Sequence, residues 1–267
     1  YGISKFSSMS LQVTEVTGSE WIGIFNDGTL TIVGGIVNGN GSDGIRSSGD
    51  LSVTATQVSG NLGSAVRHEE GMARLDSVLL SNTGPQGSRG TGAFASAEME
   101  ITGSVISGNE IGIFLSEPAT LSLSNSVVSN NSRSALNIQP GTTANVEEVT
   151  FQNNGADRGP VIYNASNLSV VRSRVIDNLQ MALYNDDGAF AAVEDSEFRG
   201  NTNPIDSAVI DNTDTAELEL RRVLIAENRV QTFRHALFNS GLMVVENVTI
   251  SNNFGNGLRS RGEATIR

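Results

Sequence analysis

The feature that most constrains the fold is an eleven-residue pattern that recurs along the whole chain. The first, third and eighth residues of this frame are apolar in all eleven copies, so none of these thirty-three positions is polar. Apolar residues therefore alternate with others over short stretches, which is the period of a β-strand and not of a helix. Four clear copies are LSVTATQVSGN (51–61), LSLSNSVVSNN (121–131), LSVVRSRVIDN (168–178) and MVVENVTISNN (243–253).

A second regularity is an Asn at the end of the frame. The eleventh position is Asn in nine copies and Ser19 or Thr83 in the other two. Usually four residues after it comes a small residue followed by an aliphatic one, a small-aliphatic pair such as Gly112-Ile113. The mean period is about 24 residues, which leaves room for three short strands. We expect the Asn side chains to bond one another along one corner as an asparagine ladder. They are Asn40, Asn61, Asn109, Asn131, Asn154, Asn178, Asn201, Asn228 and Asn253.

Short strands at this period predict an all-β coil of parallel strands, in which each rung hydrogen-bonds to the next and each aliphatic column stacks in the core. The pattern resembles the right-handed parallel β-helix superfamily, the pectin-lyase-like fold, and the resemblance covers the whole chain. It implies one solenoid domain over residues 1–267, with about eleven rungs of 21–27 residues. The segments 151–154 and 198–201 are also similar to the F-x-x-N repeats of polymorphic outer-membrane adhesins.

Composition excludes several classes of protein. The net charge is −12 and Lys5 is the single lysine, which argues against sequence-independent binding of nucleic acid. No apolar run approaches the roughly 20 residues that cross a bilayer, so we expect no membrane insertion. Cysteine is absent, which excludes disulfides and thiolate metal sites.

Both ends of the sequence lie within a rung. Residues 1–3 match the small-aliphatic element, and residues 264–267 match the first four positions of a twelfth frame. Neither end carries an amphipathic segment that could form a capping helix. Because solenoids need covered ends, we expect uncapped ends and a segment of a longer solenoid, or a unit whose ends meet other chains.

The candidate binding face follows from the strand that carries the small-aliphatic pair. The residue after the buried aliphatic should point outward, and six of the chain's fourteen aromatic residues fall in this column. Aromatic rings and Arg on a long shallow face suit sugar stacking or contact with another protein; alternatively they form an outer hydrophobic layer under longer loops. The column reads Phe25, Arg46, Arg67, Phe94, Phe114, Asn137, Tyr163, Tyr184, Ile210, Phe238 and Arg259, and its aromatic and Arg members are the candidate binding face.

Four rungs carry insertions before this strand, and we expect these to emerge along one edge of the face and to wall a groove. They are residues 84–91, 155–160, 202–207 and 229–235.

One candidate catalytic cluster is Arg67-His68-Glu69-Glu70, one rung above Arg46. In lyases of this fold, as the resemblance implies, an Arg neutralises a uronate while a base abstracts a proton. Alternatively, His68 occupies a turn column whose other members are Asn26, Asn164, Asn185, Asp211 and Asn239.

A second candidate is Asp186-Asp187 beside Tyr184, with Asp211 and Asp214 on the next rung. Paired carboxylates could bind Ca²⁺ or serve as acid and base in a glycoside hydrolase, although Asp-Asp-Gly is also ordinary turn chemistry. Otherwise we expect no metal or cofactor. The Gly-His-Gly of polygalacturonases, the lysine of some lyases and calcium-binding nonapeptides are missing.

Two functions remain in view. The first is a non-catalytic solenoid outside the cell or on its surface, an adhesin, spacer or filament subunit, whose aromatic face contacts a glycan, a protein or another copy, laterally or end to end. The second is a polysaccharide lyase or glycoside hydrolase, with Arg67, His68 and Asp186 nearest the chemistry. An ice-binding solenoid is excluded because no flat Thr-x-Thr array recurs.

Overall fold

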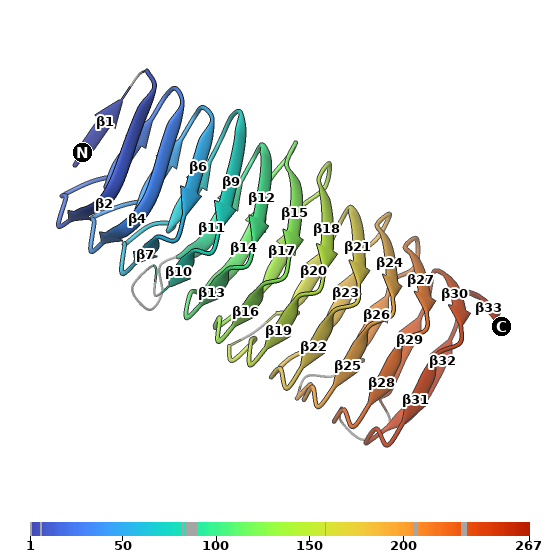
Figure 1. Cartoon of the computed structure of the whole chain (residues 1–267). Coiled ribbons are helices and arrows are strands. Elements are labelled where there is room, and N and C mark those ends of the chain that lie inside the picture. Colours follow the sequence, from blue (N-terminus) through green and yellow to red (C-terminus); the bar gives the residue numbers. More distant parts are fainter. Residues whose placement is uncertain are drawn as a thin grey trace.

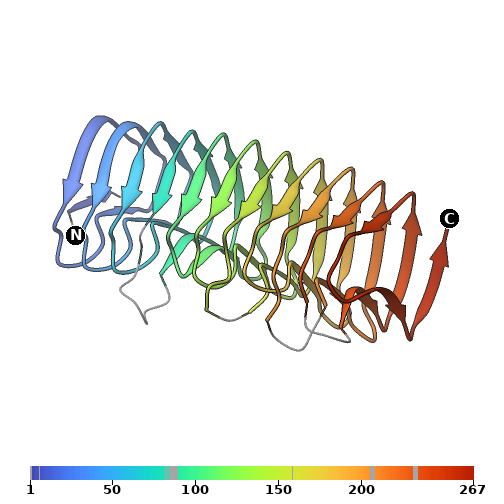
Figure 2. The same ribbon diagram turned by 90° about the horizontal axis from the view of Figure 1, so that it is seen from below.

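The chain coils into a parallel solenoid whose two ends lie at opposite ends of the molecule (Figure 1). The computed structural model describes residues 2–5, 7–81, 83, 90–157, 159–204, 208–230 and 234–267. All regular elements in these ranges are strands, and successive rungs stack in sequence order when the solenoid is seen from below (Figure 2). The predicted all-β parallel solenoid of about eleven rungs is confirmed.

One side of the solenoid is a twelve-stranded parallel sheet, called sheet A here, in which each rung contributes one short strand. Its strands are β1 (Ile3–Lys5), β3 (Ile24–Asn26), β5 (Ile45–Ser47), β8 (Val66–His68), β11 (Thr91–Ala95), β14 (Ile111–Leu115), β17 (Leu136–Ile138), β20 (Ile162–Asn164), β23 (Leu183–Asn185), β26 (Ile210–Asn212), β29 (His235–Asn239) and β32 (Asn256–Ser260).

The other 21 strands form one bent sheet with two faces, B1 and B2. Face B1 holds β2 (Met9–Thr17), β4 (Leu30–Asn38), β6 (Leu51–Thr54), β9 (Met72–Asp76), β12 (Glu98–Thr102), β15 (Thr120–Ser124), β18 (Thr143–Glu147), β21 (Asn167–Val171), β24 (Phe190–Glu194), β27 (Glu217–Arg221), β30 (Leu242–Glu246) and β33 (Glu263–Ile266). Face B2 holds β7 (Gln57–Ser59), β10 (Leu79–Ser81), β13 (Val105–Ser107), β16 (Val127–Ser129), β19 (Thr150–Gln152), β22 (Arg174–Ile176), β25 (Glu197–Arg199), β28 (Leu224–Ala226) and β31 (Thr249–Ser251). In the first two rungs β2 and β4 run through both faces.

The core consists of the predicted aliphatic columns. Val170 on face B1 is 1% exposed and Ile113 on sheet A is 0% exposed, as the frame requires. Members of the columns become partly exposed only near the ends, as at Met9, Leu11 and Ile250. Because successive side chains of a strand point to opposite faces, the same alternation that fills the core also fixes which residues face solvent.

Residues with positive φ form the corners between faces. The fifth frame residue separates B1 from B2 and has a φ of 49° at Asn125, 47° at Arg172 and 53° at Arg222. A single left-handed residue turns the chain sharply between two strands, at a small cost in backbone strain for residues other than Gly. Gly34 and Gly103 avoid this cost, and seven of the eleven residues at this corner are polar.

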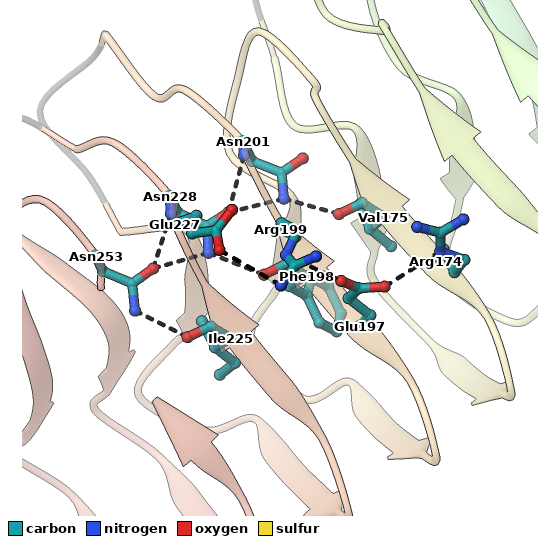
Figure 3. Close-up of polar contacts among 10 residues, drawn as sticks. All are labelled: Arg174, Val175, Glu197, Phe198, Arg199, Asn201, Ile225, Glu227, Asn228 and Asn253. Carbon is teal, nitrogen blue, oxygen red and sulfur yellow. Dashed lines mark hydrogen bonds and ion pairs between the residues drawn. The ribbon is translucent and has the colours of Figure 1, made fainter. Parts of the chain in front are cut away.

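The asparagine ladder runs along the corner after face B2. In Figure 3, the Nδ2 atom of Asn201 donates to Oδ1 of Asn228 at 2.9 Å, and Nδ2 of Asn228 donates to Oδ1 of Asn253 at 2.9 Å. Each amide also donates to a strand carbonyl of the rung before it, as Asn201 does to Val175 at 2.8 Å. The predicted ladder is confirmed, and it satisfies backbone groups that the turn would otherwise leave unpaired.

A second ladder lies beneath sheet A, where the Nδ2 atoms of Asn164, Asn185 and Asn212 each donate to Oδ1 of the next Asn at 2.7 Å. This register corrects the prediction for one rung. Asn212, not Asp211, occupies the turn column, and Ile210 is 0% exposed and pairs with Leu183 in the core. The outward residue of that rung is Asp211.

The reason for this one-residue error is the residue that takes the small position of the small-aliphatic pair. In this rung the position that usually holds a small residue is occupied by Val209, as it is by Val161 two rungs earlier, and Ile210 is the aliphatic residue that follows. The sequence Ala208-Val209 looks like a small-aliphatic pair but lies one residue before the true one.

The terminal rungs have a strand partner on one side only. Strand β1 pairs with β3, β32 pairs with β29, and β33 pairs with β30. No helix covers either end within the described ranges, as predicted. The same ranges contain no helix that could span a bilayer.

Candidate functional site

The predicted binding face forms one continuous column on sheet A. Strand pairing places all nine predicted residues in register, with Asn137 and Asp211 completing the column. All of these side chains are half-buried except that of Arg259, which is exposed. The nine are Phe25, Arg46, Arg67, Phe94, Phe114, Tyr163, Tyr184, Phe238 and Arg259.

The alternation within each strand explains why these side chains point outward. In β23, Leu183 and Asn185 are both 0% exposed and point inward, so Tyr184 between them faces solvent. Asn185 also donates to the carbonyl of Glu217 at 2.9 Å. The hydrogen bonds of the second ladder thus hold successive rungs in register directly beneath the outward side chains.

Aromatic rings of neighbouring rungs stack in pairs along the column. The rings of Phe94 and Phe114 lie 5.7 Å apart and 6° from parallel, and those of Tyr163 and Tyr184 lie 6.0 Å apart and 14° from parallel. The guanidinium carbon of Arg67 lies 4.2 Å from the centre of the Phe94 ring, in cation–π contact. The column therefore presents edges of stacked rings, broken by polar groups.

Toward the N-terminal end, acidic partners hold two of the three Arg side chains of the column, Arg46 and Arg67. Arg46 makes two bonds to Glu69, at 3.1 and 2.8 Å, a bidentate arrangement. The Nε atom of Arg67 bonds to the nearly buried Asp43 at 3.1 Å. These guanidinium groups are positioned, but much of their charge is already neutralised.

His68 does not share the outward face with Arg67. Its ring is 0% exposed within the turn column, and Nε2 bonds to the carbonyl of Gly71 at 3.1 Å. Burial lowers the pKa of His68, against smaller opposing effects of that bond and of nearby carboxylates. This placement corresponds to the turn-column alternative, and a buried neutral ring has no access to a substrate.

The three residues predicted nearest to catalysis are not brought together. Arg67 lies on β8 and Asp186 follows β23, five rungs later in sheet A. At about 4.8 Å per rung the separation is roughly 24 Å. They cannot act on one sugar unit.

Asp186 instead forms a local pair with the tyrosines. The Tyr163 hydroxyl donates to Oδ2 of Asp186 at 2.5 Å, while Oδ1 accepts the backbone N–H of Asp187. Burial and, next, this bond raise the pKa of Tyr163 to about 12. The pKa of Tyr184 is also raised, first by burial and then by the charges of Asp186 and Asp211.

This pair gives a direct spectroscopic prediction. In a background with Tyr1→Phe and Tyr184→Phe, where Tyr163 is the only phenol, Asp186→Asn should lower the pKa of Tyr163 while leaving it above the ordinary 10.0, because burial, the larger cause, remains. Phenolate absorbance measured against pH tests this. Asp187→Asn, which removes a neighbouring charge without touching that bond, is the control, and an equal shift in both variants would contradict the pairing.

A basic pocket near the C-terminal end of the column was not foreseen. Its volume is about 240 Å³, and it is lined by Ala208, Asp211, Arg234, His235, Phe238, Arg259 and Arg261. Phe238 and Arg259 belong to the predicted face, whereas Arg234, His235 and Arg261 were missed. Aligning the last two rungs pairs Phe238 with Arg259 and puts Arg261 opposite Ser240, close to the column, which is the one signal that could have found it.

A shallower cavity of about 500 Å³ lies at the opposite end, lined by Trp21, Ile22, Ser42 and Arg46. Trp21 is 68% exposed, so another aromatic surface adjoins the column there.

Two further expectations concern metal ions and the insertions. Within the described ranges no group of three or more acidic, His or Cys side chains is arranged to hold a metal ion. Calcium near Asp186 and Asp187 stays a prediction. Residues 84–89, 158, 205–207 and 231–233 lie outside the described residues, so the groove walls also stay a prediction.

Comparison with known proteins gives one family and several similar structures. A family model described as "Right handed beta helix region" matches residues 89–231, more than half of the chain. An alginate lyase from Paenibacillus sp. str. FPU-7 is 14% identical, with a TM-score of 0.49 over 96% of this chain and 92% of that one. The A-module of a mannuronan C-5 epimerase from Azotobacter vinelandii is 10% identical, with a TM-score of 0.48 over 97% and 90%.

The family 28 exopolygalacturonase of Yersinia enterocolitica is 8% identical, with a TM-score of 0.32 over 97% of this chain and 73% of that one. No curated protein matches the sequence. At such identities the structural likeness concerns the fold alone.

Proposed function

We propose that this chain, which belongs to the family of right-handed β-helix regions, binds an extended polysaccharide along the outward column of sheet A without cleaving it. The observation that carries this proposal is the row of six half-buried aromatic side chains, four of them stacked in pairs, held in register over nine of the column's ten rung steps. A polymer of that length implies action outside the cell or at its surface.

The shape of the column favours a linear ligand. Ten rung steps correspond to roughly 48 Å. A soluble monomer seldom leaves a long apolar strip bare, and the outward edges of the stacked rings give an apolar surface against which the C–H groups of sugars can pack. Asn137 and Asp211 lie in the same column and offer polar atoms to sugar hydroxyls.

The charges around the tyrosine pair favour neutral sugars at that place. Asp186 bonds to Tyr163, and Asp187 and Asp211 lie close enough to Tyr184 to raise its pKa. A uronate placed on these rings would meet carboxylates at short range, which opposes binding.

The test is a double variant, Tyr163→Ser with Tyr184→Ser. We expect the retention of the protein in affinity gels containing xylan, glucan, pectin or alginate to weaken by roughly 30-fold for any polysaccharide that retains the parent chain, the effect of losing anchors worth about 2 kcal/mol. Folding should stay nearly intact because both rings lie outside the core.

The matched control is Val33→Ser with Leu242→Ser, which removes two exposed apolar side chains from face B1. Retention should not change. If the tyrosine variant instead lowers the melting temperature and alters no association with glycan, protein or a second copy, the column is an outer hydrophobic layer and the proposal is wrong.

A second candidate, polysaccharide cleavage, rests on the short bond between Tyr163 and Asp186. A hydrogen-bonded phenol and carboxylate could exchange a proton with a substrate. If the protein forms products from a polysaccharide, and Asp186→Asn abolishes product formation while retention in the gel persists, the chain is an enzyme and not only a binding surface.

A further inference from the structure

The basic pocket at the C-terminal end of the column differs from the rest of the face in its charge. Arg234, His235, Arg259 and Arg261 surround it, and Asp211 is the only carboxylate among the described residues of its lining. This concentration of cationic side chains occurs in a chain whose net charge is −12. A local excess of positive charge on an acidic protein selects for anions at that place.

The rings and guanidinium groups of the pocket converge on Phe238. The His235 ring lies 5.8 Å from the Phe238 ring and 19° from parallel, and the guanidinium carbon of Arg261 lies 5.6 Å from the centre of that ring. Arg259 is the register partner of Phe238 on the next strand. The pocket thus combines an apolar aromatic surface with cations around it.

Two of these Arg side chains differ in ion pairing from most Arg residues in the described part of the chain. Nine other Arg side chains in the described part of the chain form ion pairs with carboxylates, from Arg46 to Arg222. Arg259 and Arg261 form none with any described residue. Burial and the nearby Arg259, Arg234 and Arg261 lower the pKa of His235, so the imidazole is neutral while the guanidinium charges remain.

We infer that this pocket binds an anionic group carried on a sugar ring, a carboxylate or a sulfate ester, with the guanidinium groups of Arg259 and Arg261 on the anion and the ring against Phe238. At about 240 Å³ it is smaller than the roughly 300–1,000 Å³ of typical ligand pockets, so it takes a single sugar unit. Arg is the side chain best suited to both oxyanions because its planar fork can donate two parallel bonds.

This inference rests on the proposed function and narrows its ligand class. The acidic surroundings of the tyrosine pair disfavour anions, whereas the pocket two rungs later, about 10 Å away, favours them. The ligand is therefore a polysaccharide with neutral sugars over the tyrosines and an acidic sugar in the pocket, not a uniformly charged polymer.

The two histidines of the chain make the inference testable without knowledge of the natural polymer. His235 lines the pocket, and His68 is 0% exposed far from it, so their ring signals in NMR serve as reporter and internal reference. Titration with glucuronate, glucose 6-sulfate, glucose and inorganic sulfate distinguishes a carboxylate from a sulfate and a sugar from a free ion.

We expect glucuronate, glucose 6-sulfate or both to shift the His235 signals saturably, with no change at His68 and no effect of glucose. The pKa of His235 should rise on binding, since an anion favours the protonated ring; the charged groups facing that ring are Asp211, Arg234, Arg259 and Arg261. Arg259→Gln with Arg261→Gln should weaken binding at least about tenfold.

Two variants separate the parts of the pocket. Arg221→Gln with Arg222→Gln removes the same charge from paired side chains elsewhere and should not change binding. Phe238→Leu should weaken binding of the sugar anion more than that of inorganic sulfate. Unchanged His68 signals report that each variant is folded.

The inference is overturned if neither sugar anion shifts His235 saturably, if only inorganic sulfate does so, or if the Arg259 and Arg261 variant binds as tightly as the parent. The proposed function fails separately, through the tyrosine variant, whose two residues do not line the pocket.

Discussion

Replacing Leu123 with aspartate is expected to lower the free energy of unfolding by about 4 kcal/mol or more. Leu123 is 0% exposed in β15 and is paired in register with Ile101 and Val146, both of which are also buried. The substitution removes an aliphatic side chain from a packed column and buries a carboxyl group without a partner. Denaturant unfolding followed by far-UV circular dichroism measures the loss.

The neighbouring Ser122→Asp is the matched control, because Ser122 is exposed on the same strand. It should change stability by no more than about 0.5 kcal/mol. Since burial disfavours the charged carboxylate, the Leu123 variant should lose more stability at pH 8 than at pH 4, whereas Leu123→Asn should show no such dependence. Equal effects of the two aspartates would show that the alternation assigned to this strand is wrong.

The repeating parts of this fold could be predicted from the sequence because strand alternation and rung stacking act on every copy in the same way. A polar residue at Val170 or Ile113 would have no partner in the core, so the apolar columns alone indicate the inside of the solenoid. The same reasoning placed the outward side chains, and hence the nine residues of the binding face, without any structure.

Errors arose where a rung departs from the repeat. Because Val209 fills a position that is usually small, the frame slipped by one residue and Ile210 was placed outside. His68, by contrast, occupies the turn column that its place in the repeat allowed, and one hydrogen bond to the carbonyl of Gly71 holds it there.

The chemistry of the site was harder to predict than its position. The hydrogen bond between Tyr163 and Asp186 joins residues 23 apart in the sequence and depends on the conformations of two side chains on neighbouring rungs. The basic pocket depends on Arg234 and His235, which lie in the insertion over residues 229–235. Because the length of such insertions differs from rung to rung, no frame placed these two residues beside Arg261.

The second large effect is expected from Asn178→Ala in the ladder, which should lower the free energy of unfolding by about 4 kcal/mol. Asn178 accepts the backbone N–H of Asn154 at 2.9 Å and donates from Nδ2 to the carbonyl of Phe151 at 3.0 Å. The variant leaves both of these buried backbone groups unpaired, and each such group costs about 1–3 kcal/mol. It also removes the hydrogen bond from the side-chain amide of Asn178 to Oδ1 of Asn201.

Two variants show whether the ladder itself is responsible. Asn145→Ala removes an exposed amide on face B1 and should change stability by no more than about 0.5 kcal/mol. Asn253→Ala should cost less than Asn178→Ala, because Asn253 is only partly buried and water can replace its bonds. Since each rung of a solenoid is stabilised by its neighbours, an interior break should also expose amides on both sides of Asn178 to hydrogen exchange. If exchange rises only at Asn178, or if the three variants are equally stable, the ladder does not couple the rungs.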